Sequence, residues 1–363
     1  MTMYLDVTAE IVARELGKDE APFLLDVREP EEVAAWAIPG IVNIPLGQLQ
    51  DRLDEIPRDR QVVAVCASGN RSGVAASVLA GIGFDTANLV GGMQAWGHLY
   101  DTATVEVPGG LVVQVRRRGK GCLSYVVGSG GEAAVVDPSV DVDRYFDVAA
   151  AHGWRITRVF DTHLHADHLS GARELAELAG ASLHLNPADT FEFPYRPLAD
   201  GELFTLDGGA ELSVATLHTP GHTLGSTVYL VSGAVLLSGD TLFVDGVGRP
   251  DLAERAEEFA RNLHRSLAER VLTLDDDVLV LPAHYGEQVP VRWDEPVGAP
   301  VGHLRSSLPP LALDESAFVT WAVARATDRP PHYQQIITAN MGRTSFPSAA
   351  LAYLEEGPNR CSA

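Results

Sequence analysis

The sequence is poor in cysteine and in positive charge, and it lacks long apolar runs. Its three cysteines, Cys66, Cys122 and Cys361, are odd in number and far apart, which excludes a disulfide framework and favours a reducing cytoplasm. Lys and Arg number 27 against 49 Asp and Glu, and this net charge of -22 argues against nucleic acid or an anionic membrane surface as a partner. No apolar run approaches the ~18 residues of a membrane span, and the first residues lack the pattern of a signal peptide. We therefore expect a cytoplasmic protein.

The length of 363 residues predicts two domains. The stretch 100–110, Y-D-T-A-T-V-E-V-P-G-G, carries turn formers and little periodicity, so we interpret it as the join between domains at 1–104 and 105–363. Further on, residues 295–315 are rich in Pro, Gly and Ser and are expected to form an extended loop, and 317–326 are expected to form a helix.

In the first domain, short apolar strands alternate with helices, which predicts a small parallel α/β sheet. Cys66 follows the strand Q-V-V-A-V and opens the loop C-A-S-G-N-R-S, which leads into a helix. Backbone N–H groups, the helix N-terminus and Arg71 would all favour a thiolate or persulfide anion there. We predict a nucleophilic Cys66, assisted by Arg71; a buried structural cysteine is the alternative. The predicted contacts of its substrate are Ser68, Gly69, Asn70 and Ser72.

The second domain holds four candidate metal ligands within six residues, in F-D-T-H-L-H-A-D-H-L-S-G at 160–171. His163 and His165 are predicted to point the same way, because side-chain direction repeats every two residues in an extended segment. Asp167 and His168 would then enter from the start of the following helix. Such a density of histidine predicts a metal site.

Three more candidate metal ligands follow predicted strands or lie in turns between them. His222 lies in the turn T-P-G-H, Asp240 ends the strand A-V-L-L-S-G-D, and His284 follows V-L-V-L-P. We expect these strand ends to meet the histidine-rich segment at one edge of a sheet structure.

The ligand types allow two metal centres. One is a dinuclear zinc centre, in which a metal-bound hydroxide could attack a thioester. In a mononuclear Fe(II) centre, the triad His163, His222 and Asp240 would leave open positions for O₂ and a thiolate-like substrate. The other four residues would then support the triad or bind a second metal.

Residues 1 to about 100 resemble the rhodanese family. C-A-S-G-N-R-S resembles its active-site loop, and L-L-D-V-R-E-P-E-E, I-P-G-I-V-N-I-P and G-G-M-Q-A-W resemble its flanking signatures, although Ala37 stands where the family often has histidine. The resemblance implies that Cys66 carries sulfane sulfur as a persulfide.

From about 107 to 290, the motifs T-H-L-H-A-D-H, G-H-T, G-D-T-L-F and P-A-H resemble the metallo-β-lactamase superfamily, which implies an αββα sandwich. Within it, G-D-T-L-F-V-D-G-V-G-R-P-D-L and P-P-H-Y-Q-Q-I-I-T-A-N-M-G resemble the persulfide dioxygenase branch. That branch implies that Arg249 and Asp251 lie near the substrate and that a short helix near the end lies at the domain's edge. A structural ion pair is the alternative role for Arg249.

Both resemblances imply sulfur chemistry. A persulfide dioxygenase would use Fe(II) and O₂ to convert a thiol persulfide, of glutathione or another small thiol, into sulfite and free thiol. Sulfite is an acceptor of rhodanese sulfur and gives thiosulfate, so the two domains would share an intermediate. The alternatives are a dinuclear zinc thioester hydrolase similar to hydroxyacylglutathione hydrolases, with an appended rhodanese, and a binding or redox-sensing role for Cys66. For the zinc hydrolase, the superfamily resemblance implies that one ion is held by His163, His165 and His222 and the other by Asp167, His168 and His284, with Asp240 as the bridge. Domains of the superfamily often dimerise, so the resemblance allows a homodimer.

Overall fold

The computed structural model describes residues 4–18, 20–206, 212–250, 255–286, 289–293, 295–325, 332–347, 354–355 and 357. The chain divides into two compact units. The smaller contains the residues up to Asp101 together with Arg117–Lys120, and the larger contains Thr102–Arg116 and the chain from Gly121 to Glu355. Asp251 and Cys361 lie outside the described residues. None of the described helices is long and apolar enough to cross a membrane.

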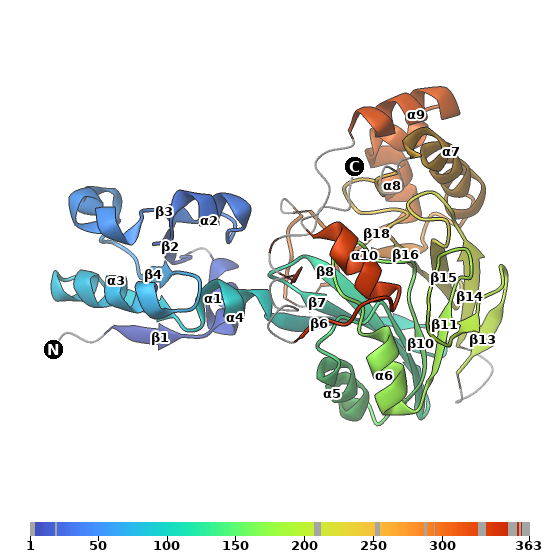
Figure 1. Cartoon of the computed structure of the whole chain (residues 1–363), viewed down its shortest axis with the longest axis horizontal. Coiled ribbons are helices and arrows are strands. Elements are labelled where there is room, and N and C mark those ends of the chain that lie inside the picture. Colours follow the sequence, from blue (N-terminus) through green and yellow to red (C-terminus); the bar gives the residue numbers. More distant parts are fainter. Residues whose placement is uncertain are drawn as a thin grey trace. The chain divides into compact units, whose positions relative to one another are not determined.

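The smaller unit is a parallel five-stranded sheet in the order β1-β5-β4-β2-β3, covered by helices (Figure 1). Apolar side chains of the strands and of the third helix form its core, in which Leu25, Val62 and Leu79 are fully buried. The carboxyl end of β4 delivers Cys66. The elements are β1 (Leu5–Val7), α1 (Ala9–Leu16), β2 (Phe23–Asp26), α2 (Pro30–Ala35), β3 (Val42–Asn43), a 3-10 helix (Leu46–Glu55), β4 (Val62–Val65), α3 (Asn70–Gly81), β5 (Thr86–Leu89) and α4 (Gly92–Gly97).

The larger unit contains two sheets, in the orders β12-β11-β10-β9-β8-β7-β6 and β13-β14-β15-β16-β17-β18 (Figure 1). The strands of the first sheet are β6 (Tyr100–Val107), β7 (Gly110–Arg117), β8 (Cys122–Ser129), β9 (Glu132–Val136), β10 (Arg155–Phe160), β11 (Ser182–Leu185) and β12 (Arg196–Pro197). Those of the second are β13 (Leu203–Thr205), β14 (Ser213–His218), β15 (Thr227–Val231), β16 (Val235–Gly239), β17 (Leu279–Pro282) and β18 (Ala299–Pro300).

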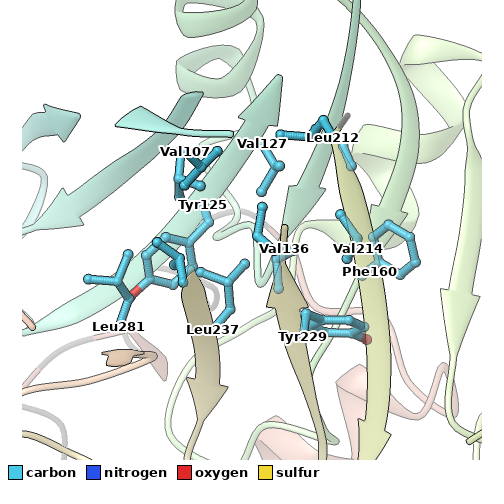
Figure 2. Close-up of a cluster of buried hydrophobic side chains, with 14 of the residues drawn as sticks. Val107, Tyr125, Val127, Val136, Phe160, Leu212, Val214, Tyr229, Leu237 and Leu281 are labelled. Carbon is cyan, nitrogen blue, oxygen red and sulfur yellow. The ribbon is translucent and has the colours of Figure 1, made fainter. Parts of the chain in front are cut away.

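The two sheets pack face to face. Figure 2 shows Tyr125 and Val136 of the first sheet meeting Tyr229, Leu237 and Leu281 of the second, all buried. Each such side chain contributes roughly 1.5–3 kcal/mol on burial. This core places the carboxyl ends of β10, β16 and β17 at one edge, where the metal-ligand types follow.

Helices cover the outer face of each sheet, which completes the αββα sandwich implied by the resemblance and confirms that prediction. α5 (Asp143–Ala151) and α6 (Ala172–Ala179) pack on the first sheet. α7 (Ala256–Ser266), a π-helical turn (Leu267–Val271), α8 (Val301–Ser307), a 3-10 helix (Pro309–Ala312) and α9 (Glu315–Ala324) follow along the chain, and their apolar side chains form one core cluster with the second sheet. α10 (Tyr333–Asn340) comes last.

The prediction of an extended loop at 295–315 was wrong, and the stretch interpreted as the join, in which the two units divide at Asp101 and Thr102, has more regular structure than its sequence indicated. The stretch 100–110 is mostly strand β6, in which the buried Ala103 and Val107 alternate with exposed residues, so a period of two was present but was masked by polar side chains. The stretch 295–315 contains β18, α8 and the 3-10 helix. Pro300 is the N-cap of α8 and Pro309 opens the 3-10 helix, so these prolines begin helices there and do not break them.

Candidate cysteine loop and metal centre

The loop after β4 wraps around the sulfur of Cys66. The backbone N–H of Gly69 lies 3.1 Å from Sγ and the hydroxyl of Ser72 lies 3.2 Å from it, and both donate to it. Gly69 has φ of 91°, and a Cβ at this position would meet the backbone nitrogen of Gly91 at 2.9 Å, so the tight turn requires glycine. The backbone nitrogen of Met93 donates to the carbonyl of Cys66 (2.8 Å), which explains why G-G-M-Q-A-W accompanies the loop.

Hydrogen bonds to the sulfur favour its ionised form. Burial opposes ionisation of Cys66, but the hydroxyl of Ser72 and the backbone N–H groups of Ser72, Ser68 and Gly69 outweigh it and lower the pKa of the thiol. The loop therefore increases the thiolate fraction at neutral pH, as nucleophilic sulfur chemistry requires.

Arg71 is paired with a neighbouring carboxylate. Its guanidinium donates two hydrogen bonds to Glu32, at 2.7 and 2.8 Å, and these lower the pKa of Glu32 to about 2. The sequence-based prediction placed Arg71 at the sulfur; the structure directs these two donors to Glu32. The side chains of Ser68 and Asn70 are exposed at the loop, while Ser72 is buried beneath it.

In the larger unit, His163, His222 and Asp240 converge. Nε2 of His163 lies 3.7 Å and Nε2 of His222 lies 3.4 Å from Oδ2 of Asp240, and all three residues are buried. Among the described residues, none of these three atoms has a hydrogen-bond partner. Buried polar atoms left without partners are costly, so their convergence fits a bound cation.

The remaining side-chain polar atoms of this triad have hydrogen-bond partners. Nδ1 of His163 lies 2.9 Å from the hydroxyl of Thr162, and Nδ1 of His222 donates to the carbonyl of Arg249 at 2.9 Å. Oδ1 of Asp240 accepts from Nδ1 of His284 at 2.7 Å. Such partners fix ring orientation and tautomer, so each ligand presents one free atom to the same point.

A second group adjoins the triad. Sγ of Cys122 and one ligand atom each of Asp167, His168 and His284 all lie within 4.8 Å of one another, and all four residues are buried. Oδ2 of Asp167 and Nε2 of His284 are 2.8 Å apart, yet neither has a hydrogen-bond partner among the described residues.

His165 is held by a carboxylate through one ring nitrogen, while its buried Nδ1 has no hydrogen-bond partner among the described residues. Its ring lies 4.2 Å from that of His163, but its Nε2 lies 3.0 Å from Oδ1 of Asp137, in a third buried group that includes Asp161. Burial opposes the charge on His165, yet Asp137 raises its pKa to about 9; burial raises the pKa of Asp161 to about 7. The segment is not the extended strand from which the common direction of the two histidines was predicted.

Asn340 and Glu355, which come late in the sequence, hold the histidine-rich segment through hydrogen bonds. Nδ2 of Asn340 donates to the carbonyls of His165 and His168, at 3.0 and 2.9 Å, and Oδ1 of Asn340 accepts from the backbone of Ser170 at 3.0 Å. Glu355 accepts from the backbone of Leu169 at 2.6 Å. These residues were not predicted: Asn340 lies in the quoted C-terminal motif, but nothing in its pattern marks a partner 172 residues away.

Asp189 ties two ligand-bearing segments together, and the sequence analysis missed it as well. Its carboxylate accepts from the backbone of Leu164 (2.9 Å), from the hydroxyl of Thr223 (2.9 Å) and from the backbone of Gly225 (2.8 Å). Leu164 lies next to His163, and Thr223 lies next to His222. Asp189 therefore fixes the distance between two triad ligands.

Arg249, predicted near the substrate, is 1% exposed, and its carbonyl holds His222. Asp251, predicted beside it, lies outside the described residues.

Comparisons with known families agree with this division. Residues 117–284 match the metallo-beta-lactamase superfamily, and residues 8–99 match the rhodanese-like domain. The chain belongs to the metallo-β-lactamase superfamily and carries a rhodanese-like domain ahead of that domain. Membership of this superfamily indicates a metal-dependent enzyme, either a hydrolase or an oxidase.

Among curated relatives, a hydroxyacylglutathione hydrolase of Acidiphilium cryptum is 37% identical over 161 residues, which cover 44% of this chain and 63% of that protein. An uncharacterized protein of Mycobacterium tuberculosis is 31% identical over 45% of this chain and 85% of its own length. The chain thus spans less than two thirds of the hydroxyacylglutathione hydrolase. Among solved structures, ETHE1 from Myxococcus xanthus matches with a TM-score of 0.56 and 25% identity, over 64% of this chain and 99% of that one.

Proposed function

We propose that the chain is an Fe(II)-dependent persulfide dioxygenase coupled to sulfur transfer at Cys66. One thiol persulfide, one O₂ and one water give free thiol, sulfite and two protons; the S–S bond breaks, and the terminal sulfur supplies the electrons that reduce O₂. In the rhodanese-like unit, sulfite attacks the outer sulfur of the persulfide carried by Cys66, which yields thiosulfate and the Cys66 thiolate. The proposed substrates are the persulfide of glutathione or another small thiol, O₂ and sulfite.

The geometry of the triad is the observation that carries this proposal. Two imidazole nitrogens and one carboxylate oxygen face one point without partners. Fe(II) held by such a set keeps open positions where O₂ and a thiolate-type sulfur can bind together. Oδ1 of Asp240 accepts from His284, which leaves a single oxygen of Asp240 facing the triad.

The residues around the triad orient it. Thr162, the carbonyl of Arg249 and His284 each hold one ligand by its other polar atom, so the three free atoms need no rearrangement to bind a metal. In the rhodanese-like unit, the hydrogen bonds that lower the pKa of Cys66 stabilise equally the negative charge on the leaving thiolate when thiosulfate forms.

The comparisons support the proposal unequally. The similarity to ETHE1 extends over 99% of that chain, whereas the matches to hydroxyacylglutathione hydrolases leave a third or more of those proteins unmatched. The flanking segment from Gly239 to Leu252 adds the resemblance to the persulfide dioxygenase branch.

A dinuclear zinc thioester hydrolase is the second candidate, and the 37% identity to hydroxyacylglutathione hydrolases favours it. It requires His165 beside His163 and His222 on one ion; Nε2 of His165 is engaged by Asp137, so its buried Nδ1, which has no hydrogen-bond partner among the described residues, would be the ligand atom.

The test is O₂ consumption by the Fe(II)-loaded chain on addition of glutathione persulfide, with sulfite measured in parallel. We expect one sulfite per O₂. If protein shown to retain its iron takes up no O₂ with the persulfides of glutathione or coenzyme A, and the zinc-loaded protein cleaves thioesters, the hydrolase replaces the dioxygenase.

A further inference from the structure

The larger unit contains a pocket of about 650 Å³ that is separate from the metal centre. Its wall is formed by residues of β9, β10, β11 and β12 in the first sheet and of β13 in the second (Figure 1). Arg155 and Ser182, which line it, are the first residues of β10 and β11, whereas the candidate metal ligands follow the other end of β10. None of those ligands lines the pocket. Its volume lies within the range of about 300–1,000 Å³ that is typical of small-molecule sites.

Four polar side chains of the pocket share one face of three neighbouring parallel strands. Arg158 pairs with Ser182 across β10 and β11, and His184 pairs with Arg196 across β11 and β12. Because side-chain direction repeats every two residues along a strand, Ser182 and His184 point to the same side of the sheet, and their paired arginines point there too. The register of the sheet therefore gathers two guanidinium groups, a hydroxyl and an imidazole.

His184 is 5% exposed and has one ring nitrogen to spare. Its Nε2 lies 2.8 Å from the hydroxyl of Ser182, and its Nδ1 has no hydrogen-bond partner among the described residues. Burial, and then the positive charges of Arg196 and Arg158, lower the pKa of His184 to about 4, so the ring is neutral at pH 7. When the hydroxyl of Ser182 donates to Nε2, Nδ1 carries the proton and can donate to a ligand.

The charges that line the pocket favour an anion. Arg155 and Arg158 share the carboxylate of Glu132, at 3.1 and 3.8 Å. Arg196 makes no hydrogen bond and no ion pair within the part of the chain that the structure describes. Three arginines against Glu132 and Glu202 leave one positive charge in surplus, although the whole chain carries a net charge of -22. Such a local reversal of charge attracts small anions.

Apolar surface completes the lining. Phe204 and Pro197 both contribute to it, and the ring of Phe204 meets that of His184 edge-on, with the ring centroids 5.0 Å apart. Small-molecule sites typically combine an apolar wall with a few polar groups that fix the orientation of the ligand. The lining therefore fits a molecule with a charged end and an apolar body.

We propose that this pocket binds a small organic oxyanion, whose carboxylate or phosphate group lies by Arg158 and Arg196 and whose apolar part lies against Phe204. A guanidinium group matches both oxyanions, because it donates two parallel hydrogen bonds to a pair of oxygens. Ser182 and Nδ1 of His184 supply the remaining polar contacts. The proposal adds a binding site to the chain and does not rest on the dioxygenase.

Calorimetric titration of the full chain as purified, at low ionic strength, tests the proposal. Adenosine monophosphate represents the phosphates and phenylsuccinate the carboxylates, so the two titrations distinguish the sources of the oxyanion. We expect at least one of them to bind at one equivalent with a dissociation constant below about 1 mM. Adenosine, which lacks the charged group, is expected not to bind.

Substitution of Arg196 locates the binding. Arg196 is exposed, so Arg196→Gln is expected to leave the fold intact and to weaken binding about tenfold, and Arg196→Lys, which keeps the charge, is expected to weaken it less. The matched control is Arg261→Gln, the same change at an exposed position of α7, which is expected to leave the affinity unchanged. An equal loss in Arg261→Gln would assign the effect to net charge and overturn the site.

A variant that strengthens binding guards against misfolding, which cannot raise affinity. Oε2 of Glu202 accepts from the backbone of Ala199 at 3.1 Å, and the amide oxygen of Glu202→Gln can keep that bond while the negative charge is lost. We expect binding to become several-fold tighter. Failure of both probes to bind, unchanged affinity in Arg196→Gln, or weaker binding in Glu202→Gln would overturn the proposal. None of these readouts depends on O₂ uptake or sulfite, so failure here and failure of the dioxygenase proposal are distinguishable.

Discussion

The cysteine loop and the metal centre are built on different scales. All the donors to the sulfur of Cys66 lie within the seven residues from Cys66 to Ser72. The triad draws on residues 163, 222 and 240, and its supports extend to Asn340 and Glu355. A local site of this kind depends on one turn, whereas the metal centre depends on the packing of the whole sandwich. We therefore expect substitutions to inactivate the two centres separately, and for different physical reasons.

We expect the largest effect from two substitutions that each remove one activity and spare the other. Asp240→Asn removes a triad ligand and should lower O₂-dependent sulfite formation by more than the ~10–100-fold that loss of a ligand's support typically costs, while thiosulfate–cyanide sulfur transfer is retained. Cys66→Ser should do the reverse. Oxygen-electrode and thiocyanate assays on both variants measure this, and joint loss of both activities in either variant would contradict the separation.

The next effect concerns Asn340. Asn340→Asp keeps the shape of the side chain but replaces the two donors to the carbonyls of His165 and His168 with an acceptor. We expect iron affinity to fall about 10–100-fold, measured by competition with a chelator of known affinity.

The matched control for this variant is Gln335→Glu, the same change of amide to carboxylate on an exposed residue of α10. Equal loss of affinity in both variants would assign the effect to charge and not to the support of the segment.

A smaller effect is expected at Asp189. Asp189→Ala leaves the backbone N–H groups of Leu164 and Gly225 without their acceptor. Each such buried group costs about 1–3 kcal/mol, offset in part because the buried carboxylate is itself costly. Denaturant unfolding should show a loss of about 1–3 kcal/mol in the larger unit. Asp147→Ala, at an exposed position of α5, should leave stability unchanged; a similar loss there would remove the special role of Asp189.

The smallest effect is on the ionisation of Cys66. Ser72→Ala removes a hydrogen bond that favours the thiolate, so the pKa of the thiol rises and alkylation by iodoacetamide at pH 7 slows several-fold. Ser68→Ala is the control, because the donor of Ser68 is its backbone N–H, which the substitution keeps. A pH–rate profile with the same midpoint in Ser72→Ala and the unsubstituted protein would contradict this account.

The sequence predicted the features formed by residues close together in the chain and missed the contacts between residues far apart in it. Alternating strands and helices, the Cys66 loop and the seven ligand types are visible as short motifs, and the sandwich followed from the resemblance. The direction of His165 depends on Asp137, which lies 28 residues earlier, and the support from Asn340 depends on packing near the end of the chain. Neither leaves a periodic or compositional trace. Strand β6 was missed because its solvent-facing side is polar and its turn formers resemble a linker.

The contacts of Asn340 and Glu355 also set an order of events during protein synthesis. The ribosome completes His168 172 residues before Asn340, and Leu169 186 residues before Glu355. At roughly 5–20 residues per second, the nascent metal-binding segment waits about 10–40 s for these partners. The rhodanese-like unit needs no such wait, since the donors around its cysteine emerge together. The histidine-rich segment therefore gains its full set of hydrogen-bond supports only after Asn340 and Glu355 have been synthesised.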